Sequence, residues 1–131
     1  MKAIFKYYRP AILWALFIFI MCSIDLGPVS KHPIFFPGFD KLTHCGFFFV
    51  LVVLWCSGLI RQQSNPIISY KQVLTITIVA VLYGGLIELL QLWVFTWRSA
   101  EWNDLFADTV GAAMGAFSVL VTIKSINYVK K

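Results

Sequence analysis

The stretch that decides the fold runs from Glu88 to Gly115 and reads ELLQLWVFTWRSAEWNDLFADTVGAAMG. It holds two apolar runs separated by a short segment that is dense in ionisable residues. Glu88 and Gln91 are three positions apart, so their side chains share a face if the first run is a helix. Four residues of the second run recur with helical spacing and form one stripe: Asp104, Asp108, Gly111 and Gly115. The sequence therefore predicts two helices whose polar stripes flank a short connection.

The connecting segment, residues 95–103, reads FTWRSAEWN and carries the only arginine in the second half of the chain, Arg98. A guanidinium group can hold a phosphate through two parallel hydrogen bonds. Arg98, the neighbouring Ser99 and Gln91 are therefore candidate substrate-binding residues.

The composition of the 131-residue chain is that of a polytopic membrane protein. Hydrophobic residues make up 60% and charged residues only 13%, whereas about a quarter of the residues of soluble domains are charged. The net charge is +5, but the lysines and arginines lie at the ends of apolar runs and form no basic patch, so nucleic-acid binding is excluded. Three cysteines within apolar segments do not indicate a disulfide framework.

Four apolar segments predict an all-α fold of four transmembrane helices, in a single membrane domain that spans residues 1–131. We expect these helices at about residues 10–26, 41–60, 72–95 and 104–123. About 20 apolar residues suffice to cross a hydrocarbon core of about 30 Å. Pro10 is expected in the first turn of the first helix, where a missing N–H is tolerated. No small-x-small cleavage site follows this helix, which favours a retained membrane helix over a cleaved signal peptide.

The start of the second predicted helix carries a further group of polar residues. Asp40 and His44 are four positions apart and face the same way, with Lys41 beside them. The helix dipole favours a carboxylate at this position, which gives Asp40 a structural explanation that His44 lacks. His44 is therefore a candidate catalytic residue, and Asp40 and Lys41 are candidate substrate-binding residues. His32 is expected to be a solvated loop histidine.

The distribution of basic residues predicts that both termini are cytoplasmic. With that orientation eight basic residues lie on the inner side and three on the outer side. The inner ones are Lys2, Lys6, Arg9, Arg61, Lys71, Lys124, Lys130 and Lys131, and the outer ones are Lys31, Lys41 and Arg98. All six acidic residues then lie at or near the outer ends of the helices, so the polar cluster is expected to open to the extracytoplasmic face.

These motifs resemble the VanZ-like family of small bacterial membrane proteins over about residues 40–115. The motifs are Asp40-Lys41-x-x-His44, Gly84-x-x-x-Glu88-x-x-Gln91, Arg98-Ser99 and Asp104-x-x-x-Asp108-Thr109-x-Gly111-x-x-x-Gly115. The resemblance implies a multi-pass protein of the bacterial plasma (inner) membrane. The family takes its name from an association with resistance to the glycopeptide antibiotic teicoplanin, and the resemblance supplies no settled reaction. The family often has Asn at the position of Asp108.

The first functional hypothesis is an enzyme that acts on a lipid-linked or phosphorylated cell-envelope substrate. His44 with Glu88 or Asp40 can serve as general acid and base, because a histidine oriented by a carboxylate titrates near neutral pH. Asp104 and Asp108 are further candidate catalytic residues. Their hard oxygen ligands also suit a divalent cation, Mg²⁺ or Ca²⁺.

Non-catalytic hypotheses remain open beside the enzyme. The polar site can bind a membrane lipid head group, a lipid-linked cell-wall precursor or a glycopeptide, or it can carry protons or a polar lipid across the membrane. The structural alternative is a polar clamp of His44, Glu88 and Asp108 that only fixes helix packing. Gly84, Gly111 and Gly115 are expected to let helices approach closely. The oligomeric state is not encoded in any pattern that we recognise.

The topology prediction can be tested with reporter fusions. A fusion at residue 131 should report a cytoplasmic location, and fusions near residues 32 and 100 should report the outside, because the basic bias places both termini inside. A C-terminus outside the cytoplasm would contradict the orientation and, with it, the outward-facing cluster.

Overall fold

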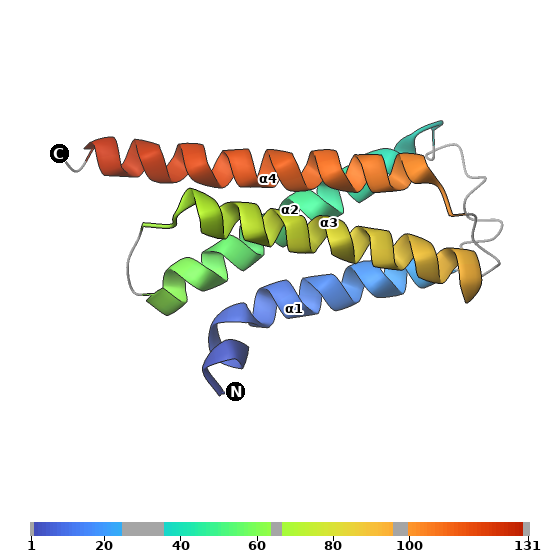
Figure 1. Cartoon of the computed structure of the whole chain (residues 1–131), viewed down its shortest axis with the longest axis horizontal. Helices are drawn as coiled ribbons and strands as arrows, with labels where there is room; N and C mark the ends of the chain where they lie inside the picture. Colours follow the sequence, from blue (N-terminus) through green and yellow to red (C-terminus); the bar gives the residue numbers. More distant parts are fainter. Residues whose placement is uncertain (1, 25–35, 64–66, 96–99, 130–131) are drawn as a thin grey trace.

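Four α-helices make up the computed structural model, which describes residues 2–24, 36–63, 67–95 and 100–129. The helices are α1 (Lys2–Ser23), α2 (Phe39–Gln63), α3 (Tyr70–Trp93) and α4 (Trp102–Val129). They run side by side as an up-and-down bundle, with both termini toward the same end (Figure 1). The ends of α1 and α3 and the starts of α2 and α4 lie at the opposite end (Figure 1).

The surface of the bundle is apolar enough for a lipid environment. Each helix contains a stretch that is long and apolar enough to cross a membrane. Large apolar side chains point away from the bundle on several helices, and Leu82 and Phe117, for example, are 67% and 70% exposed. Contiguous exposure of this kind marks a membrane-facing surface. The chain is therefore a multi-pass, all-α membrane protein, as the composition predicts.

The closest helix pair is α2 with α4, and two glycines of α4 set their approach. A Cβ atom on Gly111 would collide with the backbone carbonyl of Cys45, and one on Gly115 would lie 2.7 Å from the carbonyl oxygen of Phe49. Any side chain at these positions would push the helices apart. The two glycines thus let the backbone of α4 rest directly on the backbone of α2.

The core between the helices is apolar and is supplemented by hydrogen bonds from polar side chains. Phe48 and Val52 of α2 are fully buried beside Ile18 of α1. The indole N–H of Trp14 donates to the carbonyl of Phe47 (2.9 Å), which joins α1 to α2. The hydroxyl of Tyr83 donates to the carbonyl of Ala15 (2.7 Å), which joins α3 to α1. Such contacts between membrane helices each contribute about 0.6–2 kcal/mol.

The observed helices extend beyond the predicted ones at six of their eight ends, and three of these differences have a local cause in the sequence. The first begins at Lys2, not at Pro10, so the expectation that the proline lies in the first turn is wrong. Pro10 lies inside α1, and the start of the helix is angled away from its remainder (Figure 1), as expected where a proline removes one backbone hydrogen bond. The fourth helix continues to Val129 because its polar end contains no helix breaker. The third begins at Tyr70, where Ser69 and Gln72 form a capping box.

The glycine contact between α2 and α4 predicts a sharp difference between two glycine-to-alanine substitutions. Gly111→Ala should lower the free energy of unfolding by about 1–3 kcal/mol, because the new methyl group overpacks a backbone contact. Gly46→Ala, on α2, places its methyl group in open space and should leave stability unchanged or raise it by about 1 kcal/mol. Thermal unfolding of both variants in the same detergent measures the difference. Equal stabilities would contradict the proposed role of Gly111.

Candidate functional site

An acidic cluster occupies the end of the bundle where α3 ends and α2 and α4 begin. Its members are Asp40, Lys41 and His44 of α2, Glu88 of α3, Glu101 just before α4, and Asp104 and Asp108 of α4. His44, Glu88, Asp104 and Asp108 are buried. These four residues form the buried centre of the cluster. Asp40, Lys41 and Glu101 are more exposed and form its rim.

Lys41 organises the rim of the acidic cluster. Its ammonium nitrogen lies 2.9 Å from a carboxylate oxygen of Asp40, 2.9 Å from one of Glu101 and 3.4 Å from Oδ1 of Asp104. The three carboxylates come from the start of α2, the segment before α4 and the first turn of α4. One lysine thus joins these segments and is already surrounded by anionic partners.

Within the buried centre, His44 and Asp108 contact each other directly. Nδ1 of His44 lies 2.9 Å from Oδ1 of Asp108, and Nε2 of His44 lies 3.9 Å from Oδ2 of Asp104. An ionised carboxylate only accepts hydrogen bonds, so Nδ1 carries the hydrogen of this contact when Asp108 is ionised. In the neutral imidazole Nε2 then has a free lone pair. This lone pair, on Nε2, faces the carboxylate of Asp104.

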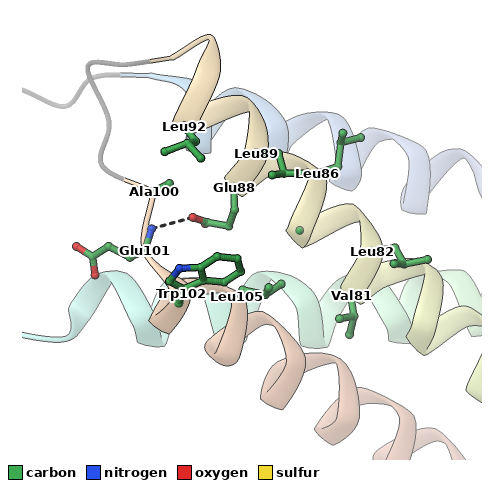
Figure 2. Close-up of a pocket in the computed structure, with 11 residues that line it drawn as sticks. Val81, Leu82, Leu86, Glu88, Leu89, Leu92, Ala100, Glu101, Trp102 and Leu105 are labelled. Carbon is green, nitrogen blue, oxygen red and sulfur yellow. Dashed lines mark hydrogen bonds between the residues drawn. The ribbon is translucent and has the colours of Figure 1, made fainter.

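Glu88 is the one member of the cluster that lies near the end of a helix and not near a helix start. It lies five residues before the end of α3, which is about 7 Å along the helix axis. Its Oε2 accepts a hydrogen bond from the backbone N–H of Glu101 (2.9 Å; Figure 2). Its Oε1 is buried and has no hydrogen-bond partner among the described residues. One oxygen of a buried carboxylate is therefore left for a ligand or a proton.

Gly84 makes room for the buried centre. It lies one helical turn before Glu88, and a Cβ atom on it would lie 2.6 Å from Oδ2 of Asp108. The absence of a side chain thus lets the Asp108 carboxylate lie against the backbone of α3. The glycine at this position is therefore explained by its contact with the Asp108 side chain, and not only by the close approach of two helices.

An apolar groove of about 530 Å³ opens between α3 and α4, and Glu88 and Glu101 are the two acidic residues of its lining. Leucines from both helices line most of it, with the ring of Trp102 near its polar end (Figure 2). The apolar lining includes Leu82, Leu86, Leu89 and Leu105. Leu82, Leu86 and Leu89 are among the exposed apolar residues of the bundle, so the groove opens on the membrane-facing surface.

Of the remaining predicted site residues, one lies outside the acidic cluster and the others lie outside the described residues. Gln91 is almost fully buried and donates from Nε2 to the carbonyl of Cys22 on α1 (2.9 Å), so its bonded partner lies on α1 and not in the acidic cluster. Arg98 and Ser99 lie outside the described residues, as does His32. Their predicted roles stay predictions.

Glu101 is the cluster member that was absent from the predicted site. Its carboxylate binds Lys41 and its backbone N–H binds Glu88. Its spacing of three from Asp104 is the signal that could have found it, although the sequence places Glu101 in the connecting segment. A residue next to a helix start can present its backbone N–H to a neighbouring carboxylate.

Two groups of three side chains place potential metal ligands close together. In each, one ligand atom from every residue lies within 4.8 Å of the others: His44, Glu88 and Asp104 in the buried centre, and Asp40, Glu101 and Asp104 on the rim. Asp104 is common to both. Asp108, predicted to bind a cation together with Asp104, belongs to neither group and is bonded to His44.

Comparisons with known proteins identify the family of the chain. No curated protein and no solved structure matches. A family model described as VanZ/LLP1 matches residues 4–124 of the 131. The match includes the acidic cluster and all four helices, and it extends the resemblance drawn from residues 40–115 to the first helix. The chain therefore belongs to the VanZ/LLP1 family.

Proposed function

We propose that this protein binds a lipid-linked component of the bacterial cell envelope, with the apolar chain in the groove between α3 and α4 and the polar head at the acidic cluster. The observation that carries the proposal is the junction of the two at Glu88, a buried acidic residue in the lining of an apolar, membrane-facing groove. The basic bias of the sequence favours a site reached from the extracytoplasmic side of the plasma membrane.

The groove suits a lipid chain for reasons of size and surroundings. Its volume of about 530 Å³ falls in the range of about 300–1,000 Å³ that is usual for small-molecule sites. Its leucine walls offer an alkyl chain contacts as apolar as those of the bilayer. A lipid can therefore enter sideways from the membrane without exposing its chain to water.

The charges of the described cluster favour a head group that donates hydrogen bonds. Five carboxylates face one lysine and one histidine, and Lys41 already lies beside three of the carboxylates. Two buried carboxylate oxygens of the cluster, Oε1 of Glu88 and Oδ1 of Asp104, accept no hydrogen bond among the described residues. Oδ1 of Asp104 lies 3.4 Å from Lys41, so Oε1 of Glu88 is the more open acceptor, and hydroxyl, amide or amine hydrogens of a sugar- or peptide-bearing head group would satisfy it. Binding of a phosphate group is proposed for Arg98, on its sequence position alone.

If the protein catalyses a reaction at the bound head group, His44 would be the residue that transfers protons. Its ring is oriented by Asp108, and its Nε2 faces Asp104. A neutral imidazole held in this way can accept a proton from a hydroxyl group, and its protonated form can return it. Teicoplanin tolerance would then be one outcome of a changed envelope lipid.

The alternative with specific support is the structural clamp, because His44, Asp108 and Lys41 all make contacts between helices. Glu88→Gln distinguishes the two. The amide oxygen can still accept from Glu101, so membrane abundance and thermal stability should stay within about 0.5 kcal/mol of the wild type, as expected of a shape-conserving change. The amount of co-purifying lipid and any glycopeptide susceptibility phenotype should fall sharply, because the acceptor for the head group is lost.

His44→Gln and Asp104→Asn should behave like Glu88→Gln if the three residues serve one site. Lipid content is measured by mass spectrometry of the purified protein, beside abundance and melting temperature. Should all three variants keep full lipid content and phenotype at normal abundance, the cluster is a structural clamp.

Filling the groove tests the apolar half of the proposal. Gly85 lines the groove, and a Cβ atom there would lie 3.9 Å from a Leu105 methyl carbon, an ordinary contact distance, so the ring of Gly85→Phe should occupy the groove. We expect bound lipid to fall at least about tenfold, equivalent to about 1.4 kcal/mol. Leu74→Phe, an exposed position of α3 outside the groove, is the matched control. Equal lipid content in the two variants would contradict lipid binding in this groove.

A further inference from the structure

We infer that His44, Glu88 and Asp104 bind a divalent first-row transition metal ion, with Asp108 as the residue that positions the histidine. This site goes beyond the proposed lipid binding and does not require it. It differs from the Mg²⁺ or Ca²⁺ site expected at Asp104 and Asp108 both in its ligands and in the class of ion.

The three side chains converge from three helices. One ligand atom of each lies within 4.8 Å of the others. Metal–ligand bonds of about 2.0–2.2 Å bring the ligand atoms of a tetrahedral site to about 3.4 Å from one another, so closure around an ion needs only side-chain adjustment. The convergence on one point distinguishes this group from acidic residues that merely share a surface.

The environment of His44 is the one that a metal-binding histidine requires. Metal-bound histidines almost always donate the hydrogen of their second ring nitrogen to a carboxylate, a carbonyl or water. Nδ1 of His44 lies 2.9 Å from the carboxylate of Asp108, and Nε2 faces Asp104. Asp108 thus fixes the ring in the orientation that presents the Nε2 lone pair to the ion.

Glu88 supplies a second, independent observation. Its side chain is among the buried charged groups, 6% exposed, and its Oε1 has no hydrogen-bond partner among the described residues. A buried acceptor without a partner costs free energy and calls for a ligand. Oε2 is held by the N–H of Glu101, so the carboxylate is fixed while the other oxygen stays available.

The buried charges also favour a cation. Glu88, Asp104 and Asp108 bring three carboxylates into the buried centre, and His44 is the one other titratable side chain described there. Carboxylates buried together repel one another unless they are protonated or paired with cations. A divalent ion would offset two of the three negative charges.

The rim group is a poorer site because a cation already lies there. The ammonium group of Lys41 is 2.9 Å from Asp40, 2.9 Å from Glu101 and 3.4 Å from Asp104. A metal ion bound to these three carboxylates would have to displace it. In the buried group Lys41 lies beside Oδ1 of Asp104 alone, and Oδ2 of Asp104, which faces Nε2 of His44, has no lysine or arginine beside it among the described residues.

The ligand set indicates the class of ion. Mg²⁺ and Ca²⁺ take oxygen ligands almost exclusively, whereas imidazole favours Zn²⁺ and its first-row neighbours. One imidazole with two carboxylates suits Zn²⁺ or Mn²⁺. Three protein ligands leave a coordination position open, and Glu88 places that position next to the apolar groove.

The test measures the metal content of the purified 131-residue chain with no lipid added. The protein in detergent is stripped with a chelator, incubated with Zn²⁺ or Mn²⁺ in separate samples, desalted and analysed by elemental mass spectrometry. We expect about one ion per chain for at least one of the two metals. Wild-type protein that is folded but retains no ion above the protein-free blank would overturn the inference.

Variants locate the ion. Glu88→Gln and His44→Gln should each lower metal affinity at least tenfold, and Asp108→Asn should lower it about 10–100-fold, as changes to outer-shell partners do. Asp40→Asn, a change on the rim, should keep full occupancy, as should Thr109→Val, an exposed control on α4. If Asp40→Asn loses the ion while Glu88→Gln keeps it, the ion lies on the rim and the inference is wrong.

Two further measurements keep the result independent of folding and of lipid binding. Co²⁺ in place of the native ion should give visible absorption bands in the wild type. His44→Gln should shift these bands. Elution of the variant at the wild-type volume in size-exclusion chromatography shows that it is folded. Gly85→Phe should lose lipid but keep metal. Full lipid binding with no metal in the wild type would overturn this inference alone and leave the proposed function standing.

Discussion

The structure depends on the contact between the backbones of α2 and α4 at Gly111 and Cys45. Because Gly111 has no side chain, α4 can come close enough to α2 for this contact to fix the register of the two helices. Cys45 follows His44, and Asp108 and Asp104 precede Gly111 by three and seven residues on the same stripe of α4. The glycine therefore sets the level at which both carboxylates face His44, and a larger residue there would disturb the site as well as the packing.

The placement of the acidic cluster follows from the cost of charge in a membrane. An Asp at the centre of a membrane helix costs about 2.5–3.5 kcal/mol on insertion scales, and the cost falls toward the interface. Six of the seven cluster residues lie at or near helix starts, and the N–H groups exposed there favour carboxylates. Glu88 is the exception, because it lies near the end of α3, where the helix dipole disfavours a negative charge, and its Oε1 has no hydrogen-bond partner among the described residues. A buried carboxylate at the unfavourable end of a helix, with one oxygen unsatisfied, indicates a ligand-dependent role.

The sequence predicts the four helices well because their apolar runs are long and the polar residues recur with helical spacing. It also predicts the Asp104, Asp108, Gly111 and Gly115 stripe, since that depends only on spacing within one helix. The spacing of residues within one helix does not indicate which other helix those residues face. Glu88 and Gln91 point about 60° apart on α3, and this is enough to send one toward α4 and the other toward Cys22 of α1. The roles of Glu101 and the groove depend on contacts between helices that no local pattern contains.

The groove and the acidic cluster meet at Glu88 and Glu101, and this junction limits what the site can serve. A water-soluble ligand would gain nothing from the leucine walls, and a purely apolar ligand would leave the buried carboxylate unsatisfied. A molecule with an alkyl chain and a hydrogen-bonding head satisfies both, and its chain can remain at bilayer depth while its head reaches the level of His44. The proposed ion would bind Oε1 of the same carboxylate, and this oxygen has a second lone pair that can accept a hydrogen bond from a head group. Glu88 is thus placed to contact a lipid head group and an ion at once, so that each would be held within reach of the other.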